Sequence, residues 1–106
     1  MDLETYREAV LRLPNVSEET PFGPDVLVYK VGGKMFALLG LNNPEPYTNL
    51  KCDPDRAEEL RAEYSGIRPG YHMSKKHWNS VDLDVGDALL LELLQHSYDL
   101  IAPKKK

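Results

Sequence analysis

The residue types best suited to binding chemistry are concentrated between Arg68 and Trp78. This stretch contains the cationic, imidazole and aromatic residues Arg68, Tyr71, His72, Lys75, Lys76, His77 and Trp78. No acidic residue occurs between Glu63 and Asp82, so the stretch is locally basic although the chain has a formal net charge of −4. Cations bind phosphates and aromatic rings stack on bases, so this composition predicts a nucleic-acid contact.

A structural role competes with this prediction. An alternating strand would place Trp78 on the packed face of a sheet, and this favours a core position for it. Tyr71 is open to the same interpretation. Lys75 and Lys76 lie in a predicted hairpin turn and cannot be buried, so phosphate contact and simple solubility explain them equally well.

Two further lysines, Lys34 and Lys51, lie on predicted strands. If both point to a sheet face without helices, they extend the basic patch with Arg68. Lysines on an open antiparallel face also keep it soluble and discourage edge pairing, and this second explanation is favoured.

Metal and catalytic chemistry are poorly supported. His72 and His77 are separated by a predicted turn, and with Cys52 they match no compact ligand spacing. Cys52 precedes a helix start, where a thiolate is favoured, but no oxyanion loop or glycine-rich phosphate loop accompanies it. We therefore expect no catalytic residue, no metal site and no cofactor.

Composition indicates one ordinary globular domain over residues 1–106, with 102–106 as a flexible tail that includes three lysines. The chain has 106 residues, of which 42% are hydrophobic and 28% are charged. Its apolar runs are too short to span a membrane, and its acidic start is unlike a signal peptide. A lone cysteine suits a reducing cytoplasm. We expect a cytoplasmic monomer.

Helical signals occur in three places. Asp2 caps a first helix that Pro14 ends, and Asp53-Pro54 begins a second that stops near Ser65-Gly66. The third follows Asp84, which with Asp87 resembles a capping box, and its apolar face predicts a deeply buried helix.

Strand signals separate these helices, whereas residues 15–24 are expected to be irregular. Gly32-Gly33 is typical of a hairpin, and residues 67–70 read as a turn. The predicted strands cover residues 26–31, 35–39, 47–52, 71–73 and 77–83. The order α-β-β-β-α-β-β-α predicts an α+β fold with a single antiparallel sheet and helices packed on one face.

The chain resembles the MmcQ/YjbR family along nearly its whole length. The segments that carry this resemblance are residues 13–16, 21–23, 31–37, 50–54, 69–79 and 97–98. The resemblance implies a CyaY-like, that is frataxin-like, domain of a kind usually labelled DNA-binding. It also suggests iron binding on an acidic first helix, but Arg7 and Arg12 neutralise that helix here.

These observations predict a non-catalytic domain that binds nucleic acid, with DNA expected, through a basic hairpin and an open sheet face. The alternative is a module that binds a protein or a small ligand on the same surface and has no nucleic-acid role. Salt-insensitive binding anchored by Tyr71 or Trp78 would favour the alternative.

Overall fold

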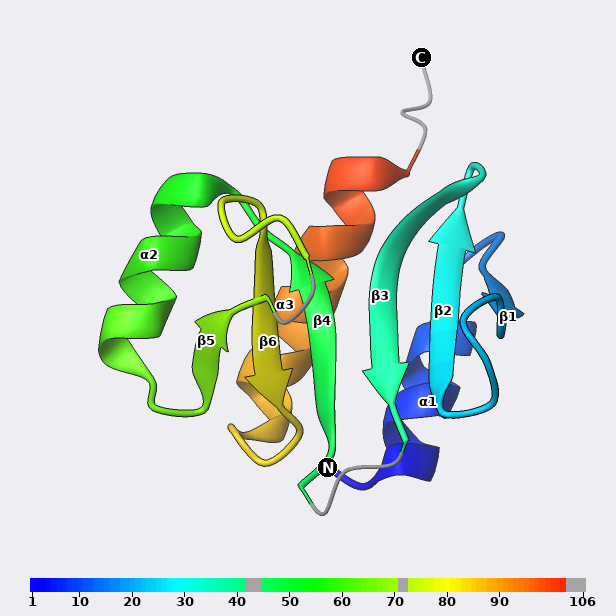
Figure 1. Cartoon of the computed structure of the whole chain (residues 1–106), viewed down its shortest axis with the longest axis horizontal. Coiled ribbons are helices and arrows are strands. Elements are labelled where there is room, and N and C mark those ends of the chain that lie inside the picture. Colours follow the sequence, from blue (N-terminus) through cyan, green and yellow to red (C-terminus); the bar gives the residue numbers. More distant parts are fainter. Residues whose placement is uncertain (42–44, 71–72, 103–106) are drawn as a thin grey trace.

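The computed structural model describes residues 1–41, 45–70 and 73–102. Among these residues it contains one six-stranded sheet, in which paired strands are antiparallel, and three helices (Figure 1). The strand order is β1-β2-β3-β4-β6-β5. The elements are α1 (Leu3–Leu11), β1 (Ser17–Glu19), β2 (Val26–Val31), β3 (Lys34–Gly40), β4 (Tyr47–Lys51), α2 (Pro54–Glu63), β5 (Ile67–Pro69), β6 (Trp78–Asp82) and α3 (Asp87–Ile101). This architecture confirms the predicted α+β fold, with β1 as an additional strand.

The main core lies between the sheet and the helices that cover one of its faces (Figure 1). Alternate strand residues such as Tyr29, Leu39 and Leu50 point into it, because successive side chains of a strand face opposite sides. Tyr6 of α1 and Leu90 of α3 pack against them, and both are fully buried. The opposite face therefore depends on loops for cover.

Two helix starts and one hairpin form as predicted. The Asp2 side chain accepts a hydrogen bond from the Thr5 amide at 2.7 Å, and Asp53 caps α2 in the same way ahead of Pro54. Gly32 and Gly33 both have positive φ angles, as the tight turn between β2 and β3 requires.

The predicted capping box before α3 is wrong. The N-cap is Gly86, with φ at +116°, and no side chain caps this helix end. Asp87 is instead the first helical residue, where its carboxylate lies 3.4 Å from the amino group of Met1. A positive φ is easily adopted only by glycine, so the backbone conformation determines the cap here.

The segment predicted to be irregular contains β1, which pairs with β2. Its central residue, Glu18, accepts two hydrogen bonds from Arg7, each 2.8 Å long, and one from the hydroxyl of Tyr29. The Arg7 hydrogen bonds hold the pKa of Glu18 below its usual value. Local pattern did not predict this strand because partners distant in the sequence stabilise it.

The partner of β6 also differs from the prediction. Residues 67–69, predicted to lie in a turn, form β5 and pair with residues 79–81 of β6. The strand predicted at 71–73 is not present at Met73, which lies in a bend, and Tyr71 and His72 fall outside the described residues. Lys75 and Lys76 do lie in a turn, as predicted, and the Ser74 carbonyl accepts a hydrogen bond from the His77 amide at 3.2 Å across it. This turn is part of the longer connection between β5 and β6 and is not the tip of a tight hairpin.

Gly70 fixes one end of that connection. Its amide donates to the Trp78 carbonyl at 2.9 Å, and an added Cβ would lie 2.7 Å from the Trp78 Cβ. Glycine therefore permits the close approach of two backbone segments here.

No helix in the described parts of the chain has the length and apolar character needed to cross a bilayer.

Candidate binding groove on the open sheet face

The sheet face without helices carries a second, smaller apolar cluster. Val28, Leu38 and Trp78 form it, and each is buried although no helix covers them. Met35 and Met73 pack at its edge. Trp78 is only 8% exposed, so it belongs to this cluster and does not offer a free ring for stacking.

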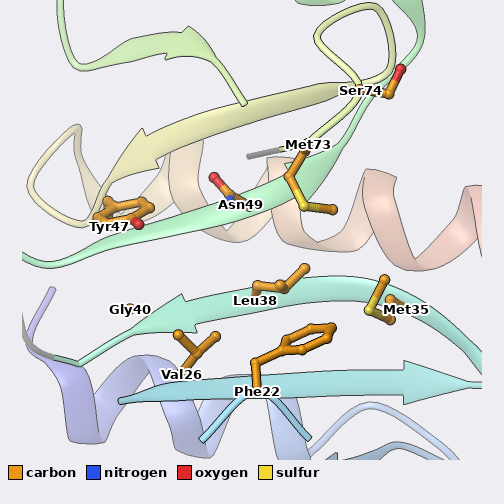
Figure 2. A pocket seen from close by; sticks show the side chains of 9 residues that line it. All are labelled: Phe22, Val26, Met35, Leu38, Gly40, Tyr47, Asn49, Met73 and Ser74. Carbon is orange, nitrogen blue, oxygen red and sulfur yellow. The ribbon is translucent and has the colours of Figure 1, made fainter. Parts of the chain in front are cut away.

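An open groove of about 610 Å³ lies over this cluster. Figure 2 shows Phe22 near β2 and Met73 near β4, on opposite sides of Leu38. Phe22 precedes β2 in a loop rich in proline and is 64% exposed. The lining residues are Phe22, Val26, Met35, Leu38, Gly40, Tyr47, Asn49, Met73 and Ser74. Most of these side chains are apolar, and the volume is typical of ligand pockets.

The floor of the groove has a polar strip. Asn49 of β4 lies opposite Leu38 of β3 on one side and opposite Ser80 of β6 on the other. The Ser80 hydroxyl donates to the Asn49 side-chain oxygen, and both residues are buried. This hydrogen bond fixes the Asn49 amide beneath the groove.

Arg61 of α2 anchors the connection that carries Met73 and Ser74. Its guanidinium donates to the Asn79 side-chain oxygen at 2.6 Å and to the Trp78 carbonyl at 3.2 Å, and it also donates to the Lys75 carbonyl. Arginine offers several donors in a rigid plane, so one side chain ties β6 to the preceding connection. This wall of the groove is thereby held to the helix layer.

Arg68, a predicted phosphate ligand, is already occupied. Its guanidinium lies 2.8 Å from the carboxylate of Asp82 and 5.7 Å from the centre of the Tyr47 ring. An arginine paired with a carboxylate contributes little net positive charge to a surface. Arg68 therefore does not add to the positive charge of the lysines that were predicted to bind phosphate with it.

The four lysines that were predicted to bind phosphate do not lie on one surface. Lys75 and Lys76, with His77, are exposed on the connection that follows Ser74. Lys51 is half-buried on the open face, at the position in β4 that follows Asn49 on that face. Lys34 pairs with Val31, a core residue, so its side chain leaves the sheet on the helix side. No described carboxylate forms an ion pair with any of these lysines.

Cys52 is buried, and burial raises the pKa of its thiol. The thiol is therefore protonated at neutral pH, which is unfavourable for a nucleophile. Its amide donates to the His77 carbonyl at 2.8 Å, so this residue joins β4 to the connection through the backbone. Within the described ranges no three His, Cys, Asp or Glu side chains lie close enough to hold a metal ion.

Sequence reasoning missed most of the groove. Phe22, Met35 and Met73 come from three different segments, and only Met73 lies within the basic stretch, where it was not singled out. One signal was present: Phe22 is an aromatic residue between Pro21 and Gly23 in a loop, where an apolar ring has no obvious core to enter. Exposed apolar side chains of this kind mark contact surfaces when they are contiguous.

The fold and the groove define an α+β domain with an open, apolar sheet face. The sequence profile described as YjbR matches residues 11–100, and the chain belongs to the YjbR family. The uncharacterized protein YbdF of Escherichia coli O157:H7 is 42% identical over 100 residues, covering 92% of this chain and 82% of YbdF. The uncharacterized protein YjbR of E. coli K12 is 37% identical over 71 residues, covering 65% of this chain and 60% of YjbR.

Solved structures show the same arrangement. The crystal structure of DR2400 from Deinococcus radiodurans superposes with a TM-score of 0.87 at 42% identity, covering 92% of this chain and 76% of DR2400. A Pseudomonas syringae protein superposes with a TM-score of 0.82 at 27% identity, covering 94% of this chain and 98% of that one. These matches support the α+β fold and the family.

Proposed function

We propose that this chain is a non-catalytic binding domain whose ligand occupies the groove on the open sheet face. The observation that carries the proposal is the groove itself, in which an exposed Phe22 and the side chains of Met35 and Met73 surround Leu38. Methionine adapts its shape and its sulfur is polarizable, which suits contact surfaces for apolar ligands. The apolar lining favours the ligand-binding alternative over a purely electrostatic surface.

The absence of a catalytic role is part of this proposal. Among the described residues that line the groove, Tyr47 is the one with an ionisable side chain, and its ring lies beside Arg68. General acid–base catalysis needs a group that exchanges protons near neutral pH. The burial and raised pKa of Cys52 likewise favour a structural role for the thiol.

An uncharged apolar probe tests the groove. We expect Nile red to bind the purified protein with saturable fluorescence, and Phe22→Ser to weaken that binding about tenfold, because it removes the apolar surface of one wall. Leu91→Ser is the matched control. Leu91 is also an exposed apolar residue, at 41%, but it lies on α3 in the helix layer. Equal weakening by both changes, or no saturable binding by the unaltered protein, would refute the proposal.

Nucleic-acid binding, with DNA expected, is the second candidate function. The observation that favours it is the exposure of Lys75 and Lys76 beside the groove, with no ion pair to a described carboxylate. With Arg68 neutralised by Asp82, about two or three phosphate contacts remain, which corresponds to a log–log salt slope of about −2 to −3.

Combined Lys75→Ala and Lys76→Ala substitution tests this second function. It should reduce the steepness of the salt slope for a short DNA duplex by about two, because each lost phosphate contact removes about one. Lys30→Ala is the control, since its ammonium already lies 3.4 Å from Glu19. The measurement is fluorescence anisotropy at several salt concentrations. A duplex that fails to bind at low salt, or an unchanged slope, excludes this function.

A further inference from the structure

Three basic residues of the strands, Lys30, Lys51 and Arg68, have side chains on the open face, and they differ in whether a carboxylate forms an ion pair with them. Lys30 is paired with Glu19 at 3.4 Å, and Arg68 is paired with Asp82 at 2.8 Å. Lys51 has no such partner among the described carboxylates. The positive charge of Lys51 is therefore the one on these strands that an incoming anion would meet without competition.

Lys51 lies on the open sheet face next to the groove floor and is not itself one of the residues that line the cavity. In β4 it follows Asn49 on the same face, and Asn49 lines the groove. Alternate residues of a strand are about 6.6 Å apart, so the ammonium can reach the edge of the cavity on its flexible side chain. Across the sheet Lys51 pairs with Trp78, and it is itself half-buried.

The other end of the groove has the opposite character. Tyr47 lines it, and the neighbouring Arg68 charge is offset by Asp82. Glu45, which is exposed, comes just before β4 at that end. A ligand with one negative charge is therefore favoured in a single orientation, with its anionic group towards Lys51.

We propose that the ligand is a small apolar acid, whose hydrocarbon or aromatic body lies over Leu38 between Phe22 and Met73 and whose carboxylate meets the ammonium of Lys51. This inference rests on the proposed function of the groove and names the chemistry of its ligand. Lys75 and Lys76 follow Ser74 at the groove wall and add positive potential around the bound anion. Asn49, which is 5% exposed and lines the groove, lies beneath the ligand body.

Two probes of equal chain length, decanoate and decanol, separate the role of charge from that of apolar contact. Trp78 is the one tryptophan of the chain and packs with Leu38, so its fluorescence reports on occupancy of the groove. We expect decanoate to bind about tenfold more tightly than decanol, since a charge-assisted contact in a partly buried site has that magnitude.

Lys51→Met removes the charge and keeps an unbranched side chain that is one heavy atom shorter. It should reduce the affinity for decanoate about tenfold, to that of decanol, and leave the affinity for decanol unchanged. Lys30→Met is the matched control, because Lys30 leaves the same face but is already paired, and it should change neither affinity. Calorimetric titration gives a second measurement that does not depend on Trp78.

The outcomes distinguish the two proposals. If decanol and decanoate bind equally to the unaltered protein, or if Lys51→Met leaves decanoate binding unchanged, the acid specificity is wrong and the groove remains a binding site. If neither decanol nor Nile red binds, the groove is not a ligand site and both proposals fail.

Discussion

Replacing Trp78 by alanine should lower the free energy of unfolding by about 3–5 kcal/mol, the range found for large aromatic side chains in cores. Trp78 is 8% exposed and packs with Val28 and Leu38, and Met73 closes over the cluster. Alanine would leave a cavity on a sheet face that has no helix to collapse into it. Chemical denaturation followed by circular dichroism measures the loss without relying on tryptophan fluorescence.

Phe22→Ala is the matched control for Trp78→Ala. Phe22 is an aromatic residue on the same face but is 64% exposed, so its removal should change stability by no more than about 0.5 kcal/mol. An exposed stacking platform would behave in the opposite way, with little loss of stability on substitution of Trp78 and a large loss of base binding. A loss of less than about 1 kcal/mol in the free energy of unfolding for Trp78→Ala would therefore indicate that Trp78 is a ligand contact and not a core residue.

Replacing Ser97 by alanine should cost about 2–4 kcal/mol, although alanine is the better helix former. The Ser97 hydroxyl is fully buried on α3. It donates to the Phe36 carbonyl at 2.5 Å and accepts from the Lys51 amide at 2.9 Å. Its removal leaves two main-chain groups of β3 and β4 without these partners, and each carries a desolvation cost.

Ser65→Ala provides the comparison for Ser97→Ala. Ser65 is exposed after α2, and its substitution should change stability by no more than about 0.5 kcal/mol. Amide hydrogen exchange adds a local measurement, because the Lys51 amide should lose protection specifically in Ser97→Ala. Unchanged protection at Lys51 would mean that the hydroxyl does not hold this strand end, even if stability falls.

Ser97 connects the helix layer to the proposed ligand site. Lys51 is placed by its backbone, which Ser97 holds from the core side, while its side chain leaves on the open face. Arg61 likewise holds the backbone of the connection that carries Met73 and Ser74, because its guanidinium donates hydrogen bonds to the Trp78 and Lys75 carbonyls. The groove is thus lined by strand residues and by the loops that carry Phe22 and Met73, and polar contacts from α2 and α3 position its edges.

The sequence by itself determined the elements whose causes are local. Asp2 and Asp53-Pro54 begin helices because capping needs only a side chain and the amides that follow it. Gly32-Gly33 determines a turn through its own backbone freedom. Alternation within the strands placed Trp78 on a packed face, and the ordered motifs predicted the family that the profile match shows.

Only the tertiary structure decided which side chains meet. Nothing in the sequence links Arg68 to Asp82, yet strand register brings them together and removes Arg68 from the basic patch. Glu18 and β1 depend on Arg7 and Tyr29 in the same way. The groove exists because the loops that carry Phe22 and Met73 fold over one face of the sheet. Such contacts depend on strand register and loop path, which no local pattern of residues encodes.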